Sequence, residues 1–176
     1  MKIEMKDLRD HPVDLEISIS PKALELEDPE YIFPENVTGA IVFTLAGDNP
    51  VAKGRVDTEV ESECVRCLVK VRTPVRAAID VVYEAVKEPI TPELEVFGGA
   101  DADERTAYFD GDTILPINQI REAIMLDLPP LPLCRPDCKG LCPNCGTNLN
   151  TTTCNCLRVT ENAPSWKSAL KNMKLE

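Results

Sequence analysis

The sequence predicts an α+β fold in which a mainly antiparallel sheet packs against one helix and is followed by a small cysteine-rich segment. Valine-rich runs with alternating apolar residues indicate strands between residues 39 and 86. Apolar residues at helical spacing indicate one helix near residue 120, and six of the eight cysteines lie between Cys134 and Cys156. With 43% apolar and only 5% aromatic residues, the core must be filled largely by aliphatic side chains.

The strands are taken in chain order. Residues 13–20, VDLEISIS, form a short alternating strand, and residues 21–37, which hold three prolines, are expected to be irregular with one helical turn. In the run from residue 39 to 86, GDNP marks a turn between strands. The motif CVRC falls between two long strands, so we expect it at a hairpin tip.

The predicted helix lies within residues 114–132. Pro116 suits its first turn, and Pro129 with Pro130 stops it. Its apolar residues recur at spacings of three and four: Ile117, Ile120, Ile124 and Leu128. We therefore expect residues 1–133 to form the α+β sheet domain with this helix on the sheet, residues 134–160 to form a cysteine-rich segment packed on it, and residues 161–176 to form a short terminal helix.

The eight cysteines form four close pairs. The N-terminus is charged and lacks the apolar run of a signal peptide, and no stretch approaches a membrane span, so a cytoplasmic protein is expected. Disulfides are rare in that reducing compartment. Tetrahedral zinc binds four thiolates, so eight cysteines make two complete zinc sites and give the segment a zinc-ribbon-like character. The candidate ligands are Cys64, Cys67, Cys134, Cys138, Cys142, Cys145, Cys154 and Cys156.

Two combinations of the pairs are open. In the favoured one, Cys142 and Cys145 join the pair at 154 and 156 across a hairpin, GTNLNTTT, and the pair at 134 and 138 meets CVRC across the fold. In the other combination, the pairs at 134/138 and 142/145 bind one ion, and the two cysteines of CVRC bind the second ion with the pair at 154 and 156. The motif CPNCG resembles a metal knuckle, because Gly146 can take the positive φ that turns backbone amides toward sulfur. An iron–sulfur cluster on some of the thiols is less favoured.

The sequence offers little for catalysis. A dithiol reading of CVRC would need the start of a helix, where the helix dipole lowers a thiol pKa, but strand-like sequence flanks the motif. His11 is the single histidine, and no phosphate-binding glycine motif occurs. A zinc ion closed by four thiolates has no position for water and is structural. We therefore expect a non-enzymatic protein without a small-molecule substrate, with a thiol redox protein as the alternative.

The motifs resemble those of a known family. ECVRCLVKV in a sheet, an acidic segment and then INQIREAIMLDLPPLPLCRPDCKGLCPNCGTNLNTTTCNC strongly resemble the bacterial YceD family, the large ribosomal RNA subunit accumulation proteins, over roughly residues 50–160. This resemblance implies a cytoplasmic bacterial factor that supports accumulation of 23S ribosomal RNA and large-subunit biogenesis, with no known reaction. The family's cysteine pattern covers all eight cysteines, whereas their role as zinc ligands is inferred from spacing.

The charge of the chain indicates which class of partner it binds. The formal net charge is −11, and residues 88–112 carry eight acidic residues against one arginine. RNA binding normally relies on lysine and arginine, so a basic ribosomal protein or a pre-ribosomal particle is favoured over direct contact with 23S rRNA. A direct RNA-binding zinc protein remains an alternative. RNA or a partner would then meet the basic tail patch of Arg135, Lys139, Arg158, Lys167, Lys171 and Lys174.

Overall fold

The computed structural model describes residues 1–86 and 105–156. Its main sheet has five strands in the order β2-β3-β4-β5-β6. The first four pair antiparallel, and β6 pairs parallel to β5. The strands are β2 (Val13–Ile19), β3 (Val37–Ala46), β4 (Asn49–Glu63), β5 (Lys70–Ala85) and β6 (Thr106–Phe109). The expectation of a mostly antiparallel sheet is thus confirmed, with a parallel edge strand that alternation did not reveal.

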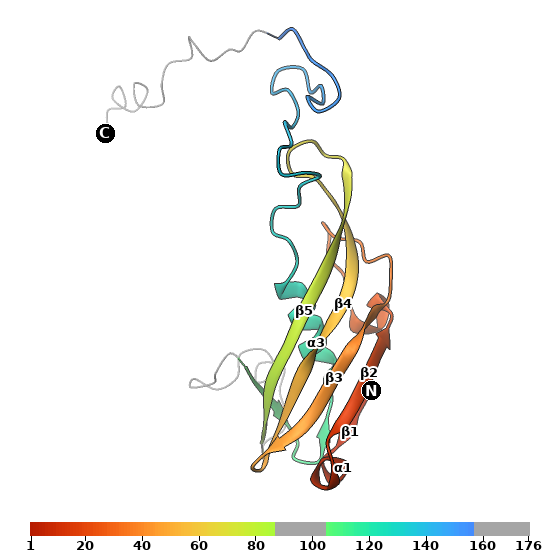
Figure 1. Cartoon of the computed structure of the whole chain (residues 1–176), viewed down its shortest axis with the longest axis vertical. Coiled ribbons are helices and arrows are strands. Elements are labelled where there is room, and N and C mark those ends of the chain that lie inside the picture. The colour runs from red at the N-terminus through yellow and green to blue at the C-terminus, as the bar shows by residue number, and fades with distance from the viewer. Residues whose placement is uncertain (87–104, 157–176) are drawn as a thin grey trace, which may run out of the picture.

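The hairpin of β4 and β5 is the longest feature of the fold. Its pairing runs from Val51 with Val82 to Glu63 with Lys70, whereas β3 pairs with β4 only as far as Asp57. The last residues of the hairpin therefore project beyond the rest of the sheet, and the segment that follows α3 rises along them to the same end of the molecule (Figure 1). As predicted, CVRC lies at the tip, between the two strands.

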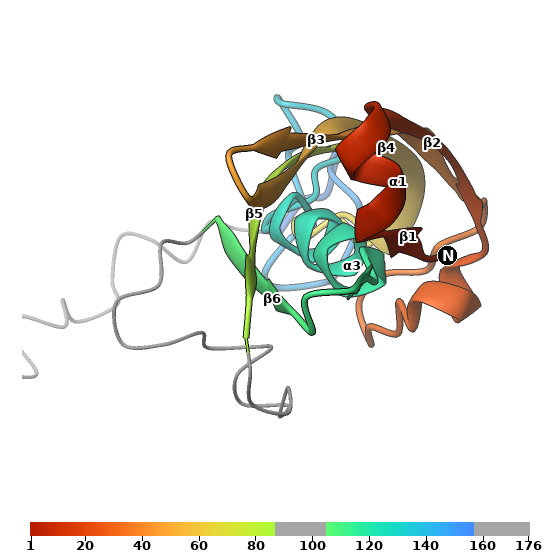
Figure 2. The same cartoon turned by 90° about the horizontal axis from the view of Figure 1, so that it is seen from below.

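Helix α3 (Ile117–Leu126) lies in the hollow of the curved sheet (Figure 2). It packs against β5, with Ile120 and Ile124 fully buried. The side chain of Tyr83 lies between the rings of Phe43 and Phe109, at centroid distances of 6.3 and 6.5 Å. Burial raises the pKa of Tyr83. The predicted helix is confirmed; Pro116 precedes its first residue and the helix ends before the two prolines.

Other short elements lie at the two ends of the sheet. The 3-10 helix η1 (Pro21–Leu24) supplies the one helical turn expected after β2. Strand β1 (Ile3–Glu4) pairs with β7 (Thr113–Ile114), and α1 (Met5–Asp10) follows β1. These last three elements could not be predicted from the sequence, because two-residue strands show no alternation and Leu8 is the single buried residue of α1.

Some expectations fall outside the described residues. The terminal helix over 161–176 and most of the acidic run lie there, and the division at residue 133 stays a prediction. Among the helices that the structure describes, none is long and apolar enough to cross a membrane.

Candidate metal centres

The thiols come together in two groups of four. Cys64 and Cys67 meet the pair at 134 and 138, and Cys142 and Cys145 meet the pair at 154 and 156. Within each group the sulfur atoms lie within 4.8 Å of one another, and all eight cysteines are free thiols. This is the first of the two combinations considered from spacing. We call the groups the long-range cluster and the local cluster.

The long-range cluster joins the hairpin tip to the segment that follows α3. Cys64 Sγ lies 3.9 Å from Cys138 Sγ, and Cys67 Sγ lies 3.5 Å from Cys134 Sγ. Three of these cysteines are buried, and Cys134 is exposed at the rim. Val71 and Leu141 pack against the cluster, so this part of the fold has its own small core.

The hairpin tip turns sharply to bring its two thiols together. The N–H of Leu68 donates to the Cys64 carbonyl at 2.8 Å, and the N–H of Cys64 donates to the Val69 carbonyl at 2.9 Å. Leu68 adopts a left-handed conformation with φ of 59°, which is uncommon for a residue with a side chain. Two residues between ligands and a turn that closes on itself are the geometry of a metal knuckle.

The local cluster is built by turns. Gly146 has φ of 71°, as expected, and its N–H donates to the Cys142 carbonyl at 2.9 Å. An isolated bridge, Leu141 with Asn148, encloses Cys142 and Cys145, and between the two cysteine pairs the chain turns through residues 148–151. The hairpin expected within residues 146–153 is therefore wrong: that stretch forms a turn without strand pairing of its own. Residues 152–156 have no regular structure, which suits a C-x-C pair that must bend to bring both sulfurs to one ion.

Asn150 connects the two clusters. It belongs to the loop of the local cluster, yet its Nδ2 donates to Cys138 Sγ at 3.3 Å and to Asn148 Oδ1 at 2.9 Å. Its Oδ1 accepts from the Lys139 N–H at 2.8 Å and from Arg135 at 2.7 Å. One amide side chain therefore holds a sulfur of the long-range cluster and the backbone that carries it. Sequence reasoning missed this residue, because an asparagine in a polar loop carries no distinctive signal.

Gly140 lets the cysteine-rich segment approach the hairpin tip. Its φ is 75°, and a Cβ at this position would lie 2.9 Å from the Arg66 carbonyl oxygen. The next residue, Leu141, donates its N–H to that same oxygen at 2.9 Å. Glycine is therefore required at position 140 both by the positive φ and by the close approach to the Arg66 carbonyl.

The thiol groups fit a tetrahedral metal ion. Zinc–sulfur bonds of about 2.3 Å place neighbouring sulfurs about 3.8 Å apart. The measured 3.5 and 3.9 Å are close to this spacing, and both are far from the roughly 2.05 Å of a disulfide. Four soft sulfur donors without a carboxylate or imidazole suit zinc or an iron–sulfur cluster.

The pKa values of the thiols show why each cluster favours a cation. Burial opposes ionisation of Cys64, but hydrogen bonds from the backbone at Cys134, Arg66 and Cys67 lower its pKa to about 6. Burial and the neighbouring thiols raise the pKa of Cys134 to about 12. A first thiolate therefore forms readily, whereas a fourth is opposed by the charge of the others unless a cation is present.

The local cluster shows the same contrast between two of its thiols. Hydrogen bonding to Thr147, whose hydroxyl lies 3.2 Å from Cys145 Sγ, lowers the pKa of Cys145 to about 6. The Cys145 thiol in turn raises the pKa of Cys156 to about 12, assisted by burial. Both clusters can therefore ionise fully only around positive charge.

The basic tail patch is only partly described. Arg135 and Lys139 are exposed beside the long-range cluster, and Arg135 also pairs with Asp137 at 3.4 Å. Arg158, Lys167, Lys171 and Lys174 lie outside the described residues. The structure thus places two members of the patch near each other and leaves its other four members untested.

Residues 52–174 match the family described as large ribosomal RNA subunit accumulation protein YceD. The chain belongs to the YceD family. The matched range covers most of this YceD chain and includes all eight cysteines. The resemblance read from the cysteine motifs is therefore confirmed, and it extends to the segment beyond Cys156.

Three relatives illustrate the similarity of this YceD chain to known proteins. An uncharacterized protein of Mycobacterium leprae is 35% identical over 136 residues, covering 75% of this chain and 57% of its own. One from Mycobacterium tuberculosis strain H37Rv is 38% identical over 99 residues, covering 54% and 43%. The chloroplastic YCED homolog 1 of Zea mays, a large ribosomal RNA subunit accumulation protein by name, is 43% identical over 58 residues, covering 32% and 20%.

The YceD chain spans about half the length of the curated mycobacterial relatives that it matches. No solved structure is a significant match to it.

Proposed function

We propose that this chain is a non-catalytic cytoplasmic factor that supports accumulation of 23S ribosomal RNA, and hence large-subunit biogenesis. The observation that carries this proposal is the family match over residues 52–174, which includes both thiol clusters. The maize relative bears the corresponding name. Because both clusters fall inside the matched range, we propose that they contribute to the function of the family.

Each cluster is proposed to bind one zinc ion with a structural role. Zinc suits four thiolates without redox change, and a fourth thiolate leaves no position for water or substrate. The long-range ion would hold the hairpin tip against the segment after α3, and the local ion would give structure to a loop with few buried apolar side chains. Zinc is thus proposed to shape a surface for a partner, not to react.

The partner is proposed to be a basic ribosomal protein, free or within a pre-ribosomal particle. The chain is acidic at −11, so its field attracts a basic protein and repels RNA. Arg66 at the hairpin tip has no acidic partner among the described residues, but along the two strands the lysine and arginine side chains are matched by acidic neighbours, as in the pairs of Lys70 with Glu61 and Arg72 with Glu59. Such pairs leave little unneutralised positive charge there for phosphate.

Complementation in bacteria that lack this protein tests the proposal. In the deletion strain we expect the ratio of 23S to 16S rRNA to fall, and expression of the wild-type chain should restore it. A chain with Cys64→Ser and Cys67→Ser should restore it poorly, whereas Arg66→Lys, an exposed and charge-preserving change between the same cysteines, should restore it fully. Normal 23S rRNA in the deletion strain would contradict the proposed function.

A further inference from the structure

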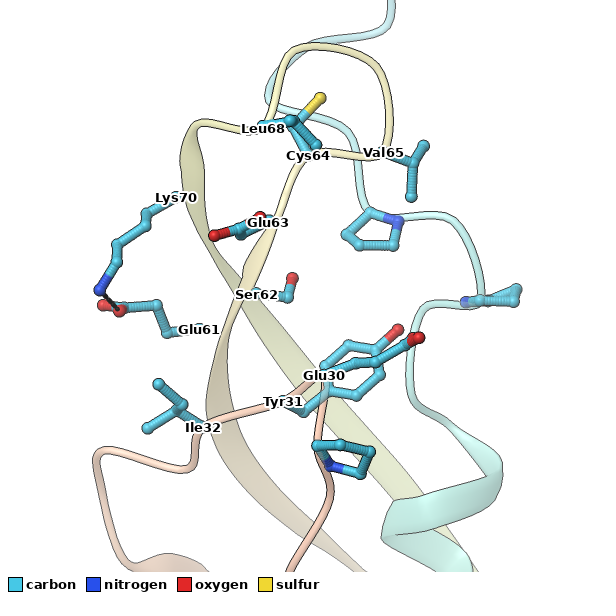
Figure 3. A pocket seen from close by; sticks show the side chains of 13 residues that line it. Glu30, Tyr31, Ile32, Glu61, Ser62, Glu63, Cys64, Val65, Leu68 and Lys70 are labelled. Atoms are coloured by element: carbon cyan, nitrogen blue, oxygen red, sulfur yellow. Dashed lines mark hydrogen bonds and ion pairs between the residues drawn. The ribbon is translucent and has the colours of Figure 1, made fainter.

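A cavity of about 490 Å³ lies between the hydrophobic core and the long-range cluster. Its walls are the end of β4, the loop that precedes β3 and the proline-rich linker after α3, including Tyr31, Ser62, Val65, Leu68 and Pro132 (Figure 3). The volume lies in the range of ligand sites. It is also large enough for one or two side chains of a bound peptide.

Ser62 forms an unsatisfied polar point in this cavity. It stands on the inward face of β4 between Val60 and Cys64, both fully buried, and is itself only 6% exposed. Its hydroxyl has no hydrogen-bond partner in the part of the chain that the structure describes. Figure 3 shows the hydroxyl directed toward the linker side of the cavity. A buried unpaired hydroxyl costs about 1–3 kcal/mol, so a ligand group that reached it would be favoured.

The cavity also borders a short free stretch of strand edge. Glu61 exchanges two hydrogen bonds with Ile32, at 2.9 and 2.8 Å, and the Val65 N–H donates to the Pro132 carbonyl at 3.0 Å. Glu63 lies between these two anchors, and its backbone groups face the same side because residues two apart in a strand share orientation. No described residue bonds to them. An incoming extended chain could therefore add hydrogen bonds here.

The rim combines apolar side chains with negative charge. Ile32, Val65 and Leu68 are 60%, 49% and 57% exposed, which is high for residues of this size in a fold with a well-filled core. Glu30 and Glu63 are among the residues that line the cavity, and neither forms an ion pair with a described residue. Glu61, by contrast, is paired with Lys70 at 3.0 Å.

We propose that this cavity is a docking site for an extended segment of a basic protein. An apolar side chain of the segment enters between Val65 and Leu68, its backbone pairs with the edge at Glu63, and flanking lysine or arginine side chains meet Glu30 and Glu63. The inference deepens the proposed function, on which it rests for the ribosomal origin of the partner. RNA does not suit the site, because the rim is acidic and apolar.

The test uses the full zinc-loaded chain and a short fluorescein-labelled peptide in which a central isoleucine is flanked by lysine and arginine. Fluorescence anisotropy should show saturable binding. The double variant Glu30→Lys and Glu63→Lys should weaken binding by about tenfold or more. The control double variant Asp48→Lys and Glu84→Lys makes the same charge change on exposed residues elsewhere and should have little effect. N-methylation of the peptide backbone at the isoleucine should also weaken binding, because it removes a strand donor.

A second pair of variants separates the cavity from general charge attraction. Ser62→Ala and Thr58→Val each remove a buried hydroxyl that lacks a partner, on the same strand. Ser62 lines the cavity and Thr58 does not. We therefore expect Ser62→Ala to weaken peptide binding and Thr58→Val to leave it unchanged. The proposal would be overturned if both charge variants lost the same peptide affinity, or if the two hydroxyl variants changed that affinity equally. It would also be overturned if the protein bound a 23S rRNA fragment more tightly than the peptide. Normal rRNA complementation by Glu30→Lys with Glu63→Lys would overturn the docking site and leave the proposed function standing.

Discussion

At the scale of single residues, the described contacts make Asn150 the link between two candidate metal centres that share no cysteine. Its side chain donates to a sulfur of one cluster from the loop of the other. Hydrogen bonds of this kind fix the orientation of a ligand and stabilise the charge on it. The long-range cluster is thereby made sensitive to the folding of the local one.

Asn150→Ala should lower the zinc affinity of the long-range cluster by about 10–100-fold. The sulfur of Cys138 would lose a donor, and the Lys139 backbone would lose its acceptor. Competition with a chromophoric chelator measures this affinity. Thr153→Ala, an exposed change in the same loop, is the control and should match wild type; an Asn150→Ala protein with unchanged affinity would remove the proposed link.

Gly140 and Gly146 provide a matched pair for the backbone contact at the tip. Both have left-handed φ, but a Cβ at Gly140 meets the Arg66 carbonyl whereas one at Gly146 meets nothing within 4 Å. Gly146→Ala should cost about 1–2 kcal/mol through φ alone. Gly140→Ala should cost clearly more in chemical denaturation, and equal losses would show that the close approach is unimportant.

At the scale of elements, the tip of the β4–β5 hairpin is joined to the segment after α3 by backbone hydrogen bonds, Val65 to Pro132 and Leu141 to Arg66, and by the long-range cluster. The 66 residues between Cys67 and Cys134 form the loop that the long-range cluster closes. A cross-link around a loop of this length stabilises a fold by up to about 4 kcal/mol through the entropy of the unfolded chain. The local cluster closes a much shorter loop within one segment.

Loss of the long-range cluster should therefore destabilise a larger part of the fold than loss of the local cluster. Cys64→Ser should lower the melting temperature of the sheet and speed amide hydrogen exchange in the hairpin tip and linker. Cys145→Ser should speed exchange in the cysteine-rich segment, including residues 135–139 that Asn150 holds, and leave the sheet unchanged. If both variants lowered the melting temperature of the sheet equally, the long-range cluster would have no special role in the fold.

The elements that sequence predicted are those whose pattern is long enough to read. Strands β3, β4 and β5 and helix α3 each carry repeated apolar positions, and the proline after α3 marks its end. The parallel strand β6 has only four residues and follows the acidic run, so its partner is set by tertiary structure. The thiols were found from their spacing, whereas the cavity depends on how Ser62 and Pro132 meet across the fold.

At the scale of the whole molecule, the proposed metal binding would be coupled to protonation of the thiols. The pKa values of Cys64 and Cys145 are lowered to about 6 from the ordinary thiol value. A lowered folded-state pKa stabilises the fold above the unfolded pKa of about 8.5, and this stabilisation is lost as pH falls through the folded value. Thiolate is also the form that binds metal.

Acidification should therefore release zinc and loosen the cysteine-rich end together. Dialysis across a pH series, followed by metal analysis and circular dichroism, should show full occupancy at pH 7 and progressive loss in acid, at a lower pH when free zinc is more concentrated, because protons compete with zinc for the thiolates. Metal content that did not depend on pH even in strong acid would contradict the proposed thiolate ligation. Alkylation adds a control, because zinc-bound thiols should react slowly at pH 7; a thiol that reacts fast with zinc in place would indicate redox chemistry instead.

The central claim is that eight thiols hold two structural zinc ions, one of which joins distant parts of the chain. Native mass spectrometry of the purified full-length protein tests it most directly. The account predicts two zinc ions per chain in the wild type, and one in Cys64→Ser with Cys67→Ser. A wild-type chain that carries no zinc, or a double variant that still carries two ions, would contradict it.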